Sequence, residues 1–155
     1  MNKLTASYLA GLLDGEGSLE IQKRKKPECK IGIMYQARIR IALTDKDLIY
    51  WLKDSFGGWV SNRIGKGKCK DSYTWCLNYG SNKKFLEKVL PYLKLKKERG
   101  EVLREFLNTF RTDSYKIVKN KLGYGTGLHK ELTDEVTQER ERLYQLIKKL
   151  NIRGK

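Results

Sequence analysis

The sequence predicts an α+β fold in which a four-stranded antiparallel sheet carries helices on one face. Two pairs of segments alternate apolar and polar residues, and stretches of helical periodicity precede, separate and follow these pairs. Paired hairpins separated by a helix favour antiparallel pairing, with one sheet face buried and the other polar. The 155 residues correspond to one domain, with a core over about 5–110 and a C-terminal helical extension over about 112–155.

The first three elements form an αββ unit. Apolar spacing and a glycine-rich end predict a helix over about 5–14. Residues 18–24 alternate as a half-buried strand does, and Pro27 then marks a turn. A longer strand over 35–43 places its odd-numbered, mostly apolar residues on the face expected to be buried.

The next three elements repeat this order. Residues 44–47 are typical of a helix cap, and the helix that follows ends at Gly57-Gly58. Strands are predicted over 59–64 and 72–79, joined by a basic, glycine-containing loop. We expect the three tryptophans to serve packing rather than base stacking, because aromatic residues at strand and helix spacing usually belong to a core.

The rest of the chain is predicted to be mainly helical. A short helix is broken at Pro91, and a further helix covers about 95–110. Residues 112–130 are expected to be irregular because they contain three closely spaced glycines. Thr133, followed by two acids, opens the last helix.

Charge is the strongest compositional feature. Lysine and arginine total 33 against 18 aspartate and glutamate, which gives a net charge of +15 and fits a polyanionic partner. The alternative is a basic protein that binds nothing acidic. No apolar run approaches the roughly 20 residues of a membrane span, so we expect an intracellular protein without membrane contact. Three cysteines without C-x-x-C spacing and a single histidine indicate neither a disulfide framework nor a zinc site.

The polar face of the predicted sheet is the expected DNA-binding surface. Its arginine, glutamine, serine and threonine side chains can read base edges in a major groove, which admits a β-ribbon. The basic run at 23–26 and the loop at 63–70 would add contacts to phosphates. The alternative is an ordinary solvated face, although that would carry more mixed charge. The expected DNA-binding residues are Glu20, Gln22, Arg24, Lys26, Gln36, Arg38, Arg40, Ser61, Arg63, Lys66, Lys68, Ser72 and Thr74.

Small residues on the first helix predict an interface between two copies of the chain. A stripe without bulky side chains lets another backbone approach closely, and the simplest partner is the same helix of a second copy. The alternative is packing within the chain. The expected interface residues are Ser7, Ala10, Gly11 and Asp14, with Gly15 in the same stripe. The face expected to be opposite carries Leu4, Tyr8, Leu12 and Leu13.

The end of this helix, Asp14-Gly15-Glu16-Gly17, predicts a metal site. In a dimer the two Glu16 carboxylates would meet near the symmetry axis, where they would repel unless a divalent cation lay between them. Carboxylate and carbonyl oxygens suit Mg²⁺, and such ions stabilise phosphodiester displacement.

Residues 9–17, LAGLLDGEG, resemble the motif of the LAGLIDADG homing endonucleases, with conservative changes at Leu13, Gly15 and Glu16. The expected element order is similar to that family's αββαββα core, a saddle-like sheet with added C-terminal helices. Residues 91–97 also resemble the family's stretch that carries an active-site basic residue. The resemblance covers about residues 8–110.

The resemblance implies a role for individual residues. Glu16 would bind the catalytic metal with its carboxylate and Gly15 with its backbone carbonyl. Lys96 would lie near the scissile phosphate. Asp45 would position a water molecule, although it is equally placed to cap a helix. The implied cofactor is Mg²⁺, with Mn²⁺ as a substitute and Ca²⁺ supporting binding only.

A single motif implies a homodimer. Such enzymes are site-specific endonucleases that cut long, nearly palindromic double-stranded DNA, leave short 3′ overhangs and copy their own intron or intein. Two alternatives stay open: an RNA-splicing maturase that binds intron RNA, and a non-cleaving DNA-binding protein. The Gly15-Glu16 pair favours cleavage. The compartment is open between chloroplast, mitochondrion and prokaryotic cytoplasm.

Overall fold

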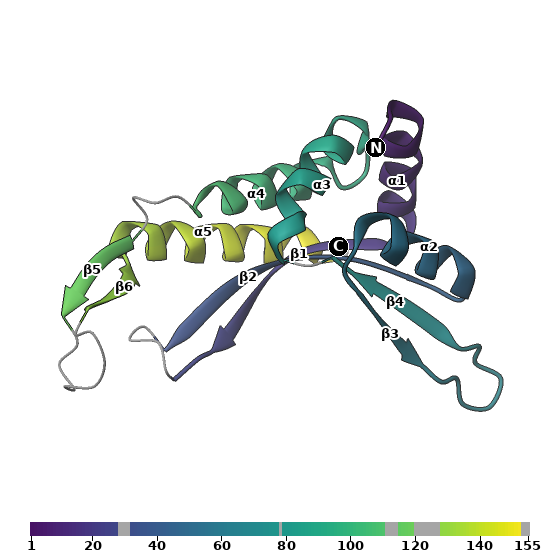
Figure 1. The fold of residues 1–155 in the computed structure, drawn as a ribbon, viewed down its shortest axis with the longest axis horizontal. Helices are drawn as coiled ribbons and strands as arrows, with labels where there is room; N and C mark the ends of the chain where they lie inside the picture. The colour runs from purple at the N-terminus through teal and green to yellow at the C-terminus, as the bar shows by residue number, and fades with distance from the viewer. Residues whose placement is uncertain (28–31, 78, 111–114, 120–127, 153–155) are drawn as a thin grey trace.

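The computed structural model describes residues 1–27, 32–77, 79–110, 115–119 and 128–152 (Figure 1). The first six elements, in αββαββ order, are α1 (Lys3–Glu16), β1 (Gly17–Lys25), β2 (Ile33–Leu43), α2 (Lys46–Phe56), β3 (Trp59–Arg63) and β4 (Ser72–Cys76). These are followed by α3 (Asn82–Val89), α4 (Lys97–Asn108), β5 (Tyr115–Lys119), β6 (Leu128–Leu132) and α5 (Asp134–Asn151). Short 3₁₀ turns at Tyr79–Ser81 and Leu90–Tyr92 flank α3.

The main sheet has four antiparallel strands in the order β1-β2-β4-β3. The two hairpins spread apart below the helices, which gives the sheet a saddle shape with one covered and one open face (Figure 1). The predicted α+β fold, with helices on one face of a four-stranded sheet, is therefore confirmed. Among the described helices, none combines the length and the apolar character that crossing a bilayer requires.

The core lies between the sheet and its helices. Residues that pair across the sheet on this face, such as Leu19 with Ile39 and Ile41 with Trp75, are completely buried. Helix α5 packs against β1 and α4. Its Leu143 and Ile147 belong to the same core, because alternating strands leave an apolar face that the helices must cover.

One strand pair lies where the sequence analysis expected irregular chain. Strands β5 and β6 form a second, two-stranded antiparallel sheet within the interval 112–132. Five-residue strands next to three glycines carry too short an alternating pattern to stand out from loop composition. The glycine-rich stretch at 123–127 lies outside the described residues.

The junction of α1 and β1 depends on a glycine. Helix α1 continues through Glu16, two residues beyond its predicted end, and β1 begins at once with Gly17. A Cβ atom at Gly17 would lie 2.5 Å from Leu13 Cδ2 and 2.7 Å from Leu13 Cα. No side chain fits there without moving the helix, so Gly17 fixes how the last turn of α1 meets the sheet.

Candidate active site and nucleic-acid interface

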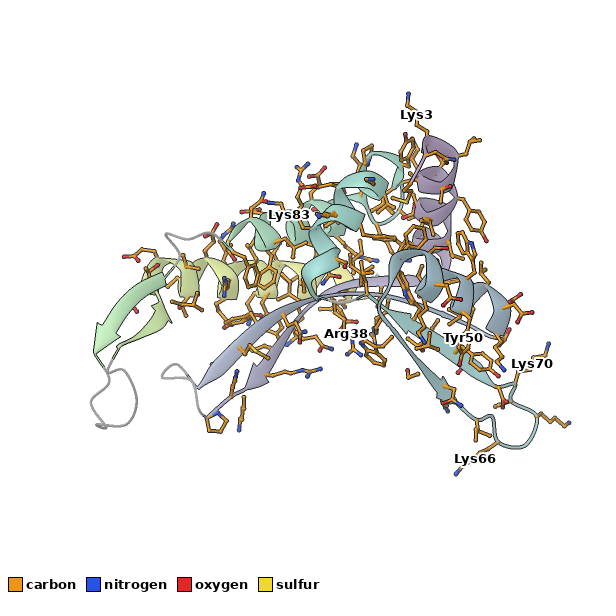
Figure 2. The ribbon with its side chains drawn as sticks, viewed as in Figure 1. Lys3, Arg38, Tyr50, Lys66, Lys70 and Lys83 are labelled. Atoms are coloured by element: carbon orange, nitrogen blue, oxygen red, sulfur yellow. The ribbon has the colours of Figure 1, made fainter. Side chains whose placement is uncertain are left out.

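The open face of the sheet carries the polar residues that the alternation predicted. Cross-strand pairs on this face include Glu20 with Arg38 and Ser61 with Thr74. The sequence neighbours of the first pair enter the core. Lys26, Lys66 and Lys68 are exposed beyond the strands. Figure 2 shows Lys66 and Lys70 at the tip of the β3–β4 loop and Arg38 between the two hairpins. The predicted strand residues on this face are Glu20, Gln22, Arg24, Gln36, Arg38, Arg40, Ser61, Arg63, Ser72 and Thr74.

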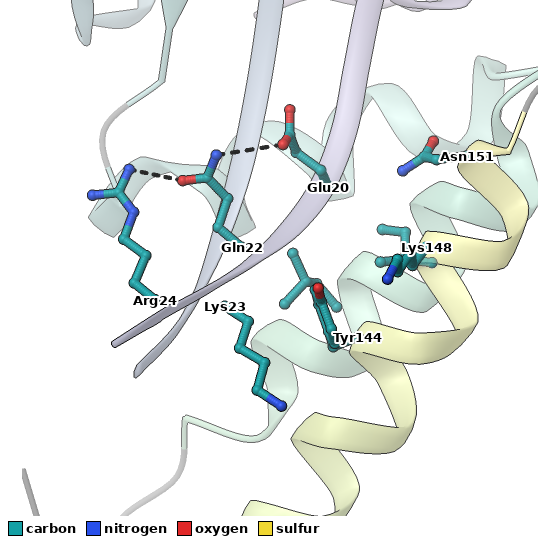
Figure 3. Close-up of a pocket in the computed structure, with 9 residues that line it drawn as sticks. Glu20, Gln22, Lys23, Arg24, Tyr144, Lys148 and Asn151 are labelled. Atoms are coloured by element: carbon teal, nitrogen blue, oxygen red, sulfur yellow. Dashed lines mark hydrogen bonds between the residues drawn. The ribbon is translucent and has the colours of Figure 1, made fainter. Parts of the chain in front are cut away.

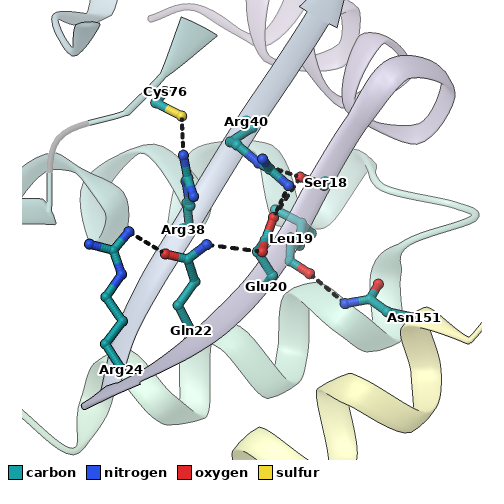
Figure 4. Close-up of polar contacts among 9 residues, drawn as sticks. All are labelled: Ser18, Leu19, Glu20, Gln22, Arg24, Arg38, Arg40, Cys76 and Asn151. Atoms are coloured by element: carbon teal, nitrogen blue, oxygen red, sulfur yellow. Dashed lines mark hydrogen bonds and ion pairs between the residues drawn. The ribbon is translucent and has the colours of Figure 1, made fainter. Parts of the chain in front are cut away.

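A hydrogen-bonded chain links five residues of β1 and β2 on this face (Figure 4). Glu20 forms an ion pair with Arg40 and accepts hydrogen bonds from Ser18 Oγ at 3.2 Å and Gln22 Nε2 at 3.4 Å. Gln22 Oε1 in turn accepts from Arg24 Nη2 at 2.8 Å. Arg40 Nε also donates to Ser18 Oγ at 3.2 Å. The acid of this face therefore balances the charge of Arg40 and orders its neighbours.

Trp59 is a residue of the open face that the sequence analysis assigned to packing. Its side chain is 46% exposed, whereas Trp75 is completely buried in the core. Trp59 shares the parity of Ser61 and Arg63 along β3, and this parity was the signal that could have identified it. The guanidinium of Arg38 lies over the Trp59 ring, 5.9 Å from its centroid.

The last turn of α1 lies beside two of the three predicted catalytic residues, Glu16 and Lys96. Glu16 and Gly15 are exposed at its end, next to the start of β1. Lys96 immediately precedes α4, and its Nζ donates hydrogen bonds to the carbonyl oxygens of Leu13 at 2.7 Å and Asp14 at 2.5 Å. Burial lowers the pKa of Lys96, with the charge of Arg99 adding to this effect and the charges of Asp14 and Glu16 opposing it.

Asp14, which was predicted to lie at the interface, uses its carboxylate for contacts within the chain. Its carboxylate accepts hydrogen bonds from the backbone N–H groups of Lys94 at 2.7 Å, Leu95 at 3.2 Å and Lys96 at 2.9 Å. These contacts lie within one chain. The carboxylate at the end of α1 thus reaches the backbone N–H groups of the turn that precedes α4, and backbone N–H groups need acceptors.

Ala10 was wrongly assigned to the interface. It is completely buried on the core face of α1, together with Leu9 and Leu13, whereas Ser7 and Gly11 are exposed. Leu4 and Tyr8, expected on the opposite face, are 83% and 51% exposed on the same side as Ser7. Ala10 enters the core because burial of the bulky leucines sets the rotation of the helix, and Ala10 lies beside them.

The exposed side of α1 continues onto α2 as an apolar surface. It is lined by Leu4, Thr5, Tyr8, Leu48 and Trp51. The rings of Tyr8 and Trp51 lie 6.3 Å apart in an edge-on arrangement. Trp51 also packs edge-on against Phe56, although it is 40% exposed. A Cβ at Gly11 or Gly15 would meet no atom within 4 Å in the single chain, so this side of α1 has room for another backbone.

Asp45 caps α2, which is one of the two roles expected for it. Its Oδ1 accepts a hydrogen bond from the backbone N–H of Leu48 at 2.9 Å. The helix therefore begins where the residues at 44–47 predicted.

The residues fit a hard divalent cation only in part. The Glu16 carboxylate and the Gly15 carbonyl are oxygen donors of the kind that Mg²⁺ prefers. The described residues include no group of three or more acidic, histidine or cysteine side chains that could hold a metal ion. Mg²⁺ usually keeps several water ligands and is bound through only one or two carboxylates, so Glu16 and Gly15 could supply the protein ligands of one chain.

A hollow of about 390 Å³ separates β1 from α5 (Figure 3). Lys23, which was expected to contact phosphates, instead turns towards α5 and binds Glu141 at 2.8 Å. Asn151 Nδ2 donates to the carbonyl oxygen of Leu19 at 3.1 Å. The end of α5 is thereby fixed to the edge strand of the sheet.

The chain combines an αββαββα order, a saddle-shaped sheet with a basic open face, and a helix end that carries glycines and acids. This is the architecture of the homing endonuclease fold. The sequence profile described as LAGLIDADG endonuclease matches residues 9–112. This chain belongs to the LAGLIDADG endonuclease family. A search of curated proteins gives no match.

Solved structures share the fold at low sequence identity. The homing endonuclease I-CvuI, in complex with DNA, has a TM-score of 0.71 and 17% identity over 99% of this chain and 85% of its own. The archaeal intron-encoded homing endonuclease I-Vdi141I, complexed with DNA, has a TM-score of 0.73 and 16% identity over 98% and 87%. The homing endonuclease I-TnaI has a TM-score of 0.60 and 18% identity over 94% of both chains.

Proposed function

We propose that this chain is a site-specific DNA endonuclease that acts as a homodimer on a long, nearly palindromic double-stranded site. The observation that carries the proposal is the single LAGLIDADG motif, which ends α1 at the edge of a basic, open sheet. The I-CvuI and I-Vdi141I structures, which contain DNA, support the choice of substrate.

Each subunit would place its open sheet face in the major groove of one half-site. A curved antiparallel ribbon fits that groove, and the arginine, glutamine, serine and threonine side chains of this face can bond to base edges. Lys26, Lys66 and Lys68 extend beyond the strands, where they can contact phosphates. The two copies would meet through the exposed side of α1, at Ser7 and Gly11, which brings the two Glu16 residues towards a common centre.

Glu16 and Gly15 would hold the divalent cation, which we propose to be Mg²⁺. When bound, the ion would supply Lewis-acid stabilisation of the phosphodiester under attack. I-CvuI was crystallised with Mg in one case and with Ca in another, which supports the use of a divalent ion. Lys96 would place a positive charge beside the scissile phosphate, and cleavage of both strands would leave short 3′ overhangs.

Glu16→Gln separates the proposed catalysis from DNA binding. Wild-type protein incubated with Mg²⁺ and a plasmid library of randomised sites should linearise a subset of plasmids. The Glu16→Gln variant should lose cleavage by at least about 100-fold, because it removes the charged metal ligand, and should still bind the selected site. Cleavage is measured on gels and binding by mobility shift in Ca²⁺.

Glu87→Gln is the matched control, since it removes one exposed acid from α3 on the covered side of the sheet. It should cut as wild type does. If Glu16→Gln cut at the wild-type rate, the proposed metal site would be wrong. If wild-type protein bound intron RNA tightly and cut no DNA, the function would be that of a maturase instead.

A further inference from the structure

The arginines on the open face differ in their ion-pair and hydrogen-bond partners. Arg40 is paired with Glu20, and Arg24 donates to Gln22. Arg38, at the middle of β2, has no carboxylate partner among the described residues. Its Nη2 donates to the thiol of Cys76 at 3.7 Å, and its guanidinium lies 5.9 Å from the centroid of the Trp59 ring.

The contacts of Arg38 orient its guanidinium without neutralising it. An aromatic face attracts a cation and restrains the guanidinium, and Arg stacks on such faces better than Lys. A thiol is a weak acceptor, and Cys76 is fixed because it is only 1% exposed. The positive charge and most of the N–H donors of Arg38 therefore stay available to a ligand on the open face (Figure 4).

This arrangement suits one base above the others. Guanine presents two acceptors, O6 and N7, in the major groove, and the planar fork of arginine can bond to both at once. A guanidinium already held in position loses less conformational entropy on binding. Arg40, by contrast, already forms an ion pair with Glu20, and contact with a base would compete with that pair.

We propose that Arg38 reads a guanine in each half-site and that Trp59 is its positioning residue. The inference rests on the proposed DNA-binding function, and it adds the specific base and the residue that orients the reader. Trp59 acts through Arg38, so removing its ring should change the preference for that base more than the overall affinity.

The test is selection of binding sites from a randomised DNA library by the full-length protein in Ca²⁺, with base frequencies determined at every position. Wild-type protein should select guanine at one base pair of each half-site. Arg38→Lys should reduce that preference about 10-fold, because lysine lacks the planar fork of arginine and stacks less well on the Trp59 ring. Trp59→Leu should weaken the preference at the same base pair by about 3-fold, and Trp59→Tyr, which keeps a ring, should retain it.

Arg63→Lys is the matched control, because it shortens another arginine of the same face and should leave this base pair unchanged. If Arg38→Lys lowered affinity equally for all sequences and changed no base preference, Arg38 would contact a phosphate and the inference would be overturned. If Trp59→Leu failed to fold, as seen by thermal unfolding, the Arg38 and Trp59→Tyr arms would still decide it. Failure of wild-type protein to select any DNA would instead overturn the proposed function, and the inference with it.

Discussion

Among single residues, Glu141 joins the middle of helix α5 to the sheet through several contacts. Its carboxylate accepts from Lys23 Nζ at 2.8 Å, from the hydroxyl of Tyr35, and from Gln145 Nε2 at 2.8 Å. The hydrogen bonds from Lys23 and Tyr35 lower the pKa of Glu141 to about 2. Burial and the hydrogen bond to Glu141 raise the pKa of Tyr35 to about 12. The cluster is therefore most stable with Glu141 charged and Tyr35 neutral.

The contacts of Glu141 predict that the free energy of unfolding depends on pH in the acidic range. Because the folded-state pKa of Glu141 lies below the usual value of 4.5, its contribution is complete above that pH and disappears as the pH falls towards 2. Glu141→Gln should lower the free energy of unfolding at pH 7 by about 1 kcal/mol. It should also flatten the loss of stability between pH 4.5 and 2, as measured by urea unfolding at several pH values.

Glu139→Gln, on the same helix, should leave the acid dependence unchanged, because the pKa of Glu141 depends on its own partners. Equal slopes with pH in the wild type and Glu141→Gln would show that this cluster does not couple folding to acid.

Among the elements, α1 and α4 are joined by reciprocal contacts between their ends. The Asp14 carboxylate binds the N–H groups before α4, and the Lys96 ammonium binds the carbonyls at the end of α1. A negative charge at a helix N-terminus and a positive charge at a C-terminus both favour the helix dipole. The two contacts hold Lys96 and Glu16 at a common site.

The variant Asp14→Asn tests these contacts between the ends of α1 and α4. The amide keeps one acceptor but loses the charge, so the free energy of unfolding should fall by about 1–3 kcal/mol. Cleavage should also slow, because Lys96 and Glu16 lose their fixed arrangement. Thermal unfolding and plasmid cleavage measure the two effects. Asp54→Asn, which removes an exposed acid of α2, is the control, and an Asp14→Asn variant as stable and active as this control would contradict the role given to these contacts.

For the whole molecule, the proposed function requires that two copies meet. The exposed side of α1 is apolar or small at Leu4, Tyr8 and Gly11, and it adjoins Trp51 of α2. Such a surface is costly to leave in water and suits self-association about a two-fold axis.

Gly11→Glu should separate assembly from folding. A side chain at Gly11 meets no atom within 4 Å in the single chain, so the fold should persist. In a dimer, two bulky carboxylates would face each other. We expect the wild type to sediment as a dimer with its DNA site, and Gly11→Glu to sediment as a monomer and lose double-strand cleavage.

The control for Gly11→Glu is Gln138→Glu, which adds the same charge on an exposed position of α5. It should remain dimeric and active. A wild-type protein that stayed monomeric on DNA, or a Gly11→Glu variant that cut both strands normally, would contradict the homodimer.

The sequence by itself determined the four-stranded sheet and the helices on one of its faces. Strand β2 illustrates why: its odd-numbered residues Tyr35, Ala37, Ile39 and Ile41 are all buried, as a period of two requires. The start of a helix could also be predicted where a side chain caps a residue close to it in sequence, as Asp45 caps the N–H of Leu48. These signals are local, so they survive without knowledge of what packs against the element.

Only the tertiary structure decided which of several equivalent side chains serve the site. Ala10 and Gly11 look alike as small helix residues, yet core packing buries the first and exposes the second. Asp14 turned inward because the start of α4, 80 residues later, offers it N–H donors. Each outcome depends on contacts between segments far apart in the chain, which periodicity and spacing do not encode.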